Sequence, residues 1–158
     1  MSGRAAAVVS YMTSSPQGPD KLARSADAWL RQAQRDLEAA RFGATGDFHA
    51  LACFLSQQSA EKAVSAFLFS RGAERVWGNA LADLCEDALA FDTGFEVIKS
   101  AAVLLDKHYL GARYPSALPG GVPAEAYDLE DSERAMAIAH EVVEFVRARM
   151  ASPGRNKD

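Results

Sequence analysis

The sequence predicts an all-α protein, an antiparallel up-and-down bundle of four to five helices. Apolar residues recur three and four positions apart along several segments, the spacing of one face of a helix. Strand-like alternation of useful length does not occur in the sequence, and glycine or proline separates the periodic segments. Amphipathic helices joined by mostly short loops pack as antiparallel neighbours, which gives a bundle.

The first predicted helix begins near Ser25, whose side chain suits an N-cap, and ends at Gly43. A second helix is predicted from about residue 47 to residue 71, with Gly72 as its stop. Its apolar residues spread around much of the cylinder, which is typical of a helix with neighbours on several sides. We therefore expect the second helix to be the central one.

Three more helices are expected along the rest of the chain. The third covers about residues 79–90, and the fourth opens with Thr93-Gly94-Phe95-Glu96, which fits a capping box, and closes near Leu110. A loop rich in proline and glycine follows. The acidic stretch from Asp128 to Asp131 then precedes a fifth helix that reaches about Met150.

The length of 158 residues is enough for one hydrophobic core. We expect a flexible N-terminal arm (residues 1–24), a helical bundle (25–150) and a flexible tail (151–158). The net charge of -4 provides no global attraction to nucleic acid, so any RNA or nucleotide site must be a local basic patch. No apolar run approaches the roughly 20 residues of a membrane helix, and the protein is expected to be cytoplasmic.

The sequence predicts neither a metal site nor a cofactor. Its two cysteines, Cys53 and Cys85, lie in apolar helical segments and have no CxxC spacing. Two buried thiols in a reducing compartment are the expected outcome. A nucleophile elbow and a glycine-rich phosphate loop are also missing from the sequence.

The stretch from Asp106 to Pro115 is the strongest candidate for a site. Asp106 and Tyr109 are one turn apart, and Arg113 and Tyr114 follow where the fourth predicted helix ends. The planar guanidinium of Arg113 suits phosphate, and aromatic neighbours suit base stacking. In the alternative interpretation, Arg113 pairs with Asp106 or Glu61 and braces the loop.

A polar cluster interrupts the second predicted helix. Gln57 and Glu61 are four residues apart, as are Gln58 and Lys62, so each pair shares an edge of the helix. Buried amides and carboxylates without partners cost free energy, so these groups must meet partners, solvent or a second subunit. Either they form a polar seam with neighbouring helices or a dimer mate, or Lys62 helps Arg113 to hold a phosphate.

Arg134 and His140 on the last predicted helix form an Arg-x5-His spacing. Such a pair could supply a phosphate clamp and a base near an RNA strand. The same spacing also arises by chance in a chain that is rich in arginine, and both residues are then simply solvated. His49 and His108 have no catalytic partner in the sequence.

Several stretches together resemble the HEPN domain family. They are Trp29 with DLEAA at 36–40, QQSAEKAVSAFL at 57–68, WGNALADL at 77–84, LDKHYLGARYP at 105–115 and the acidic start of the last helix. The resemblance covers about residues 25–150. It implies an up-and-down bundle that forms a homodimer and is often paired with a small nucleotidyltransferase in a toxin–antitoxin-like module.

The resemblance also implies a set of polar site residues in this chain. They are Gln58, Glu61, Lys62, Asp106, Tyr109, Arg113 and Tyr114. Some family members are metal-independent ribonucleases with an Arg-x4-6-His motif, whereas others are linked only to nucleotide binding. Both activities are therefore considered for this chain.

Two departures from the family pattern bear on activity. Asn79 stands where relatives of this subgroup tend to have histidine; it can cap a helix or hydrogen-bond a ligand, but it is no acid or base near neutral pH. Ala135 follows Arg134, where the ribonuclease motif normally has a polar residue.

We therefore expect a dimeric module that binds a nucleotide or RNA phosphate as the partner of a nucleotidyltransferase. Arg113 and Lys62 would supply charge, Tyr109 and Tyr114 stacking, and Gln58 or Asn79 hydrogen bonds. The alternatives are a ribonuclease toxin that uses Arg134 and His140, and a purely structural dimerisation module.

Overall fold

The structure is a computed structural model, which describes residues 19–74, 76 and 80–152. The described residues form seven α-helices and two short 3-10 turns, and no strand. The elements in chain order are α2 (Pro19–Thr45), α3 (His49–Ser70), α4 (Leu81–Leu89), α5 (Phe95–Ala102), η1 (Val103–Leu105), α6 (His108–Gly111), η2 (Pro115–Ala117), α7 (Pro123–Ala126) and α8 (Leu129–Ala151). The all-α prediction is confirmed; the helix count exceeds the predicted four to five because α6 and α7 are extra single turns.

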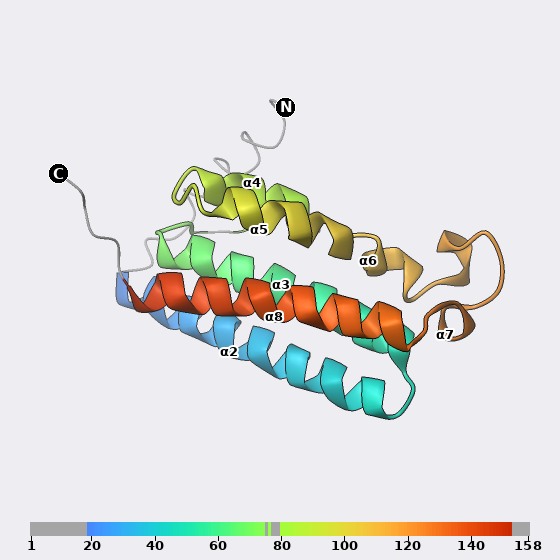
Figure 1. The fold of residues 1–158 in the computed structure, drawn as a ribbon. Coiled ribbons are helices and arrows are strands. Elements are labelled where there is room, and N and C mark those ends of the chain that lie inside the picture. The colour runs from blue at the N-terminus through green and yellow to red at the C-terminus, as the bar shows by residue number, and fades with distance from the viewer. Residues whose placement is uncertain (1–18, 75, 77–79, 153–158) are drawn as a thin grey trace.

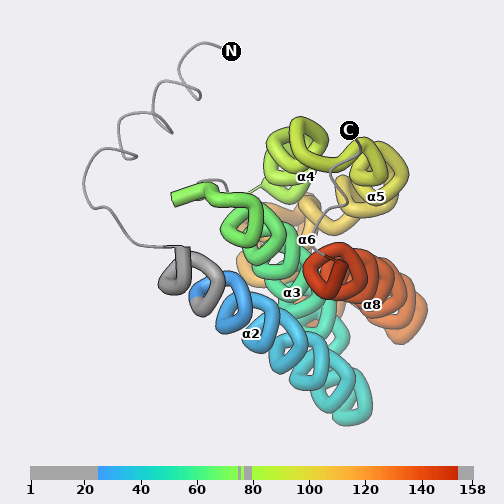
Figure 2. The backbone as a smooth tube through the Cα atoms, turned by 90° about the vertical axis from the view of Figure 1, so that its left-hand side faces the viewer, coloured from blue at the N-terminus to red at the C-terminus, as the bar shows by residue number. Residues whose placement is uncertain are grey.

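Helix α3 is the centre of the bundle, as predicted. It contacts α2 and α8 along its length and also α4, α6 and α7. Figure 1 shows the long helices α2, α3 and α8 side by side, with the shorter pair α4 and α5 on the side away from α2. The same arrangement is visible nearly end-on in Figure 2. Because α3 meets neighbours on several sides, thirteen of its residues are buried, including the polar Gln57.

An aromatic stack joins the two layers of the bundle. The ring centroids of Phe67 on α3 and Phe95 on α5 are 4.6 Å apart, and those of Phe95 and Phe145 on α8 are 5.0 Å apart. The second pair meets edge to face, the arrangement that aromatic quadrupoles favour. Phe67 and Phe95 are fully buried, so this stack anchors the α4–α5 layer on the long helices.

The boundaries of the first helix differ from the prediction. Helix α2 begins at Pro19, so Ser25 lies within the helix and is not its N-cap. The helix continues past Gly43 to Thr45, and the chain reverses at Asp47, whose φ is 65°. Sequence periodicity could not locate this turn because Gly43 is accommodated inside the helix. The predicted stop of the next helix is confirmed, since Gly72 has a φ of 96°.

The fourth predicted helix is not continuous. It is divided into α5, η1 and α6, and the 3-10 geometry begins at Val103. The predicted capping box at Thr93–Glu96 does not form. Gly94 is the N-cap of α5, no side chain caps this helix, and the backbone N–H of Glu96 donates to the carbonyl of Thr93. A capping box does form at the acidic start of α8, between Asp128 and Asp131.

The two cysteines are buried, as expected from their place in apolar helical segments. Cys53 and Cys85 are free and fully buried, and burial raises the pKa of each thiol to about 12. Within the described ranges there is no group of acidic, histidine and cysteine side chains that could hold a metal ion. None of the described helices is long and apolar enough to cross a membrane. Residues 1–18 of the predicted arm (1–24) and residues 153–158 of the predicted tail (151–158) lie outside the described residues. Residues 19–24 belong to α2, and Ala151 is the last residue of α8.

Candidate functional site

The guanidinium of Arg113 lies in a cage of three aromatic rings. Its Cζ atom is 4.5 Å from the ring centroid of Phe54, 4.5 Å from that of Tyr109 and 4.9 Å from that of Tyr114. Its Nε donates to the backbone carbonyl of Tyr109 at 2.6 Å. The rings come from α3, from α6 and from the loop after α6, which folds back onto α3 and brings them around one cation.

Arg113 forms no ion pair with a described residue. The alternative in which Arg113 pairs with Asp106 or Glu61 is wrong, because both carboxylates are bonded elsewhere. The terminal Nη donors of Arg113 have no hydrogen-bond acceptor among the described residues. Arg113 is partly exposed, so an anion can reach these donors.

Asp106 caps helix α4 from a distant part of the chain. Its Oδ1 accepts the backbone N–H of Leu81 at 2.7 Å, and its Oδ2 accepts that of Ala82 at 3.1 Å. These N–H groups belong to the first turn of α4, where no intrahelical acceptor exists. The described contacts of Asp106 are therefore those of a helix cap, and they fix the start of α4 against the 3-10 turn.

The polar cluster on α3 forms a connected seam. Glu61 accepts hydrogen bonds from the side-chain amides of Gln57 and Gln58, each at 3.1 Å, and Gln58 also donates to Gln57 at 2.7 Å. Burial raises the pKa of the Glu61 carboxyl, although the hydrogen bonds from Gln57 and the charge of Lys62 oppose this shift. These contacts match the interpretation as a polar seam satisfied within the bundle.

Lys62 is directed toward α2. Its Nζ donates to Asp36 at 2.6 Å, and both side chains are largely shielded from solvent. Lys62 lines a shallow hollow with Trp29 and Gln32 of α2, whereas Arg113 lines a different cavity. The structure thus does not bring Lys62 and Arg113 to one hollow. Asn79 lies outside the described residues.

The predicted ribonuclease pair is divided between two sides of α8. Arg134 pairs with Glu130 at 2.9 Å and lines a small cavity beside Lys107 and His108. Nδ1 of His140 lies 3.3 Å from a guanidinium nitrogen of Arg41 on α2. Within one chain, the two residues therefore do not face a common space.

His108 is buried at the contact between α6 and the loop before α8. Its Nδ1 lies 3.3 Å from the hydroxyl of Tyr127, and the two rings meet edge to face. Burial lowers the pKa of His108 to about 4, so the ring is neutral at pH 7. These contacts give His108 a packing role.

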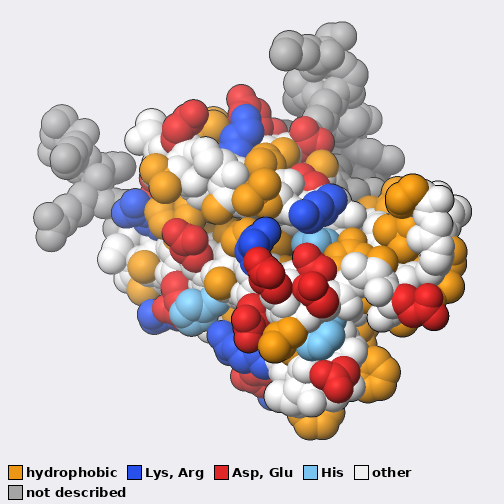
Figure 3. Space-filling view, turned by 45° about the vertical axis from the view of Figure 1, so that its right-hand side comes forward, with side chains coloured by type: hydrophobic (Ala, Val, Ile, Leu, Met, Phe, Trp, Pro, Cys, Tyr) orange, Lys and Arg blue, Asp and Glu red, His pale blue; other side chains and the backbone are white. Residues whose placement is uncertain are grey.

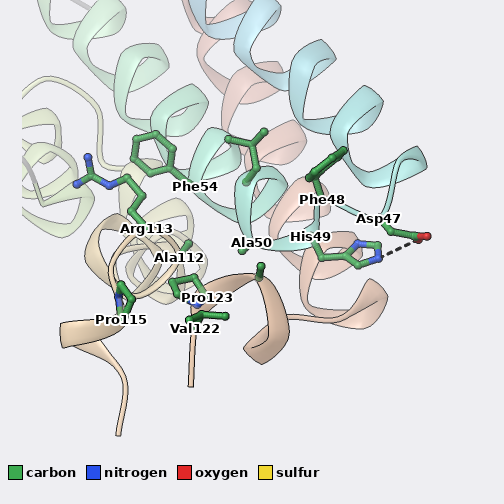
Figure 4. A pocket seen from close by; sticks show the side chains of 12 residues that line it. Asp47, Phe48, His49, Ala50, Phe54, Ala112, Arg113, Pro115, Val122 and Pro123 are labelled. Atoms are coloured by element: carbon green, nitrogen blue, oxygen red, sulfur yellow. Dashed lines mark ion pairs between the residues drawn. The ribbon is translucent and has the colours of Figure 1, made fainter. Parts of the chain in front are cut away.

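An apolar cavity of about 450 Å³ opens beside the cage. Its lining comes from the start of α3, the end of α6 and the start of α7: Asp47, Phe48, His49, Ala50, Leu51, Phe54, Ala112, Arg113, Pro115, Val122, Pro123 and Ala124. Figure 4 shows Phe54 and Arg113 together at one edge, and Asp47 beside His49 at the other.

The sequence did not identify this cavity or the part of Phe54 in the cage. In the sequence, Phe54 has the spacing of an ordinary core residue of α3. The cavity is lined by two groups of residues, 47–54 and 112–124, which are far apart in the sequence, so local spacing does not reveal it. The available signal was helical spacing, since Phe54 lies four residues before Gln58 on the same edge of α3.

The comparisons agree with this architecture. A family model of the HEPN domain matches residues 26–149. The crystal structure of TT1696 from Thermus thermophilus is 36% identical, with a TM-score of 0.74 over 78% of this chain and 97% of that one. No curated protein matches the chain.

Two further solved structures are similar. ST0689, described as an archaeal HEPN homologue, is 36% identical with a TM-score of 0.66 and covers 79% of this chain and 97% of its own. An HEPN domain protein from Thermotoga maritima is 31% identical with a TM-score of 0.64, over 78% and 98% of the two chains. With the family model matching most of its length, this chain belongs to the HEPN domain family.

Proposed function

We propose that this chain is a binding module that holds a nucleotide or an RNA phosphate at Arg113. The observation that supports this function is the aromatic cage, which fixes a guanidinium without neutralising it. A fixed arginine loses little freedom when it binds an anion, and its two terminal nitrogens suit the paired oxygens of a phosphate.

The neighbouring side chains suit the rest of such a ligand. Tyr114 is 48% exposed and presents aromatic surface next to the guanidinium, so a base can stack there. Tyr109 holds Arg113 through its carbonyl as well as its ring. We assign Asp106 and Lys62 supporting roles, because one caps α4 and the other is paired with Asp36.

The wider setting of the proposal comes from family membership. We propose that the protein is a cytoplasmic homodimer and the partner of a nucleotidyltransferase in a toxin–antitoxin-like system. We assign it no catalytic step, because Arg134 and His140 contact different elements. RNA cleavage that resists EDTA and is lost in His140→Ala would contradict this assignment.

Calorimetric titration with ATP and with a short single-stranded RNA tests the proposal. We expect binding that is lost in Arg113→Ala, while the helical circular dichroism signal stays unchanged. Arg113→Lys keeps the charge but loses the planar fork, so we expect intermediate affinity. Arg35→Ala is the matched control, because Arg35 is an exposed arginine on α2 that pairs with Glu38.

Two results would count against the proposal. Binding that survives in Arg113→Ala places the site elsewhere. If the unaltered protein binds neither probe, the proposal that this chain binds phosphate by itself is wrong. A pull-down with a nucleotidyltransferase then tests the partner separately.

A further inference from the structure

Large apolar side chains are concentrated in the half of the bundle that carries the turn between α2 and α3. Seven of the twelve large hydrophobic side chains that are exposed among the described residues lie there: Phe42, Phe48, Leu51, Leu110, Tyr114, Val122 and Leu129. Phe42 is 81% exposed and Phe48 is 64% exposed. Contiguous apolar patches on a protein surface are typical of interaction sites, and three of these side chains, Phe48, Leu51 and Val122, line one cavity.

The apolar cavity lies within this surface. Phe48, Leu51 and Val122 belong both to the exposed set and to its lining. Its volume of about 450 Å³ is within the range of functional pockets. The walls come from three separate segments, so the cavity has room for side chains that enter from outside the bundle.

Acidic side chains lie at one edge of the cavity. Asp47 lines it, and Glu125 directly follows the lining residue Ala124 on α7. The acidic residues at the start of α8 are outside the lining, and Glu130 there pairs with Arg134. At the same end, the side chain of Asp47 is 94% exposed, and Glu125 is exposed on α7. Figure 3 shows acidic and hydrophobic side chains next to one another on this face. Among the described residues that line the cavity, Arg113 at the opposite edge is the only lysine or arginine.

This distribution distinguishes between classes of partner. The acidic edge repels the phosphates of RNA, so the cavity is unsuitable as an extension of the nucleotide site. It attracts lysine and arginine, and the apolar lining accepts leucine-like side chains. An amphipathic helix presents both on adjacent faces.

We propose that this cavity is the docking surface for an amphipathic helix of a partner protein. The helix inserts apolar side chains between Phe48, Leu51 and Val122. Its basic flank lies against Asp47 and Glu125, away from Arg113. This surface shares Phe54 and Arg113 with the proposed phosphate site, but the proposed helix contacts need no bound phosphate.

Two synthetic peptides of about 18 residues provide the probes. Both carry leucine along one helical face; one has lysine on the remaining positions and the other has glutamate. Fluorescence anisotropy with the full chain at about 0.15 M salt measures their affinities. We expect the lysine peptide to bind about tenfold more tightly than the glutamate peptide.

One pair of variants tests whether the peptide enters the cavity. Ala124→Trp places an indole in the cavity, because Ala124 is exposed and lines it. Ala126→Trp adds the same group to the same short helix, at an exposed position outside the lining. We expect Ala124→Trp to weaken lysine-peptide binding about tenfold and Ala126→Trp to leave it unchanged.

A second pair of variants tests the acidic edge. Asp47→Asn with Glu125→Gln removes two charges at the cavity, and asparagine tolerates the positive φ of residue 47. Glu96→Gln with Glu141→Gln removes two exposed charges elsewhere. We expect about fivefold weaker lysine-peptide binding for the first pair and no change for the second.

Three results would overturn the proposal. Equal losses in the two neutralised pairs would show that the peptide responds only to net charge. Unchanged binding in Ala124→Trp would show that the cavity is not used. A dimer in solution that Ala124→Trp converts to a monomer would make a second copy of this chain the occupant.

Discussion

The carboxylate of Asp106 holds the backbone N–H of Leu81 at 2.7 Å, across 25 residues of sequence. A residue of the predicted phosphate site is thereby the N-terminal cap of α4. The contact also fixes the first turn of α4 to the segment that leads into the aromatic cage. A capping role makes a definite prediction about stability.

Asp106→Ala is expected to lower the free energy of unfolding by about 1–2 kcal/mol, because Leu81 and Ala82 lose their acceptors. Asp106→Asn keeps one acceptor oxygen and should cost less. Urea unfolding followed by circular dichroism measures both. Asp27→Ala, which breaks an exposed pair with Arg31, is the control and should change stability by less than about 1 kcal/mol. An equal effect of the two alanine variants would exclude the capping role.

Lys62→Met is expected to lower the free energy of unfolding by about 1.5–3 kcal/mol, because it leaves the shielded Asp36 carboxylate without its ion-pair partner. Only the hydrogen bond from Gln32 then remains on this carboxylate among the described contacts. Asp36→Leu combined with Lys62→Met removes both charges and should recover part of the loss. A double-mutant cycle gives the coupling free energy. In the exposed pair Arg35–Glu38, the same cycle should give less than about 1 kcal/mol. Coupling no larger than in this control would contradict the prediction.

Glu61→Gln is expected to stabilise the protein at pH 7. Burial raises the pKa of Glu61, so the folded chain holds that proton more tightly than the unfolded chain. The charged carboxylate therefore costs stability above the unfolded pKa, and this cost increases as the pH rises through the folded pKa. Glutamine keeps an acceptor for the amides of Gln57 and Gln58. Urea midpoints should differ at pH 7 and converge as the pH falls toward 4.5; a less stable variant at pH 7 would refute the argument.

Lowering the pH should destabilise the protein through His108. Its folded pKa is about 4, below the ordinary 6.5, so between these values the unfolded chain binds the proton first. The free energy of unfolding then falls as the pH drops through this window, by at most about 3 kcal/mol. The positive charge of Lys107 lowers the pKa of His108 further, whereas the negative charge of Asp131 raises it. His108→Gln should flatten the pH dependence of the urea midpoint relative to the unaltered protein.

The control for this experiment is His140→Gln. His140 is exposed and its only described hydrogen-bond partner is Arg41. Its replacement should leave the slope between pH 4 and 6.5 as it is in the unaltered protein. A variant of His108 with an unchanged slope would show that burial of this imidazole does not control the acid response.

Local sequence patterns were sufficient for the bundle but not for its contacts. The nearly uniform apolar character of residues 47–71 predicted a central helix, and α3 is the central helix. Helical periodicity did not reveal the 3-10 turn at Val103, because Ile98, Ala102 and Leu105 are buried on either side of the break. Apolar spacing alone cannot distinguish i+3 from i+4 geometry over one turn.

The contacts within the candidate site could be predicted only in part, for a similar reason. The sequence places Tyr109, Arg113 and Tyr114 close together because they are neighbours in the chain. It does not show that Phe54 supplies the third ring or that Asp106 caps α4, since both contacts join distant segments. The partners of polar residues in the interior are determined by packing, which sequence spacing does not specify.

Phe54 belongs to two surfaces at once. Its ring faces the guanidinium of Arg113 and also forms part of the cavity lining. Because both surfaces use this ring, binding at one can affect binding at the other, and any such coupling is reciprocal. If an anion at Arg113 shifts the ring and changes the affinity of the cavity by some factor, an occupant of the cavity must change anion affinity by the same factor. A single phenylalanine is thus the structural element through which the two surfaces would be coupled.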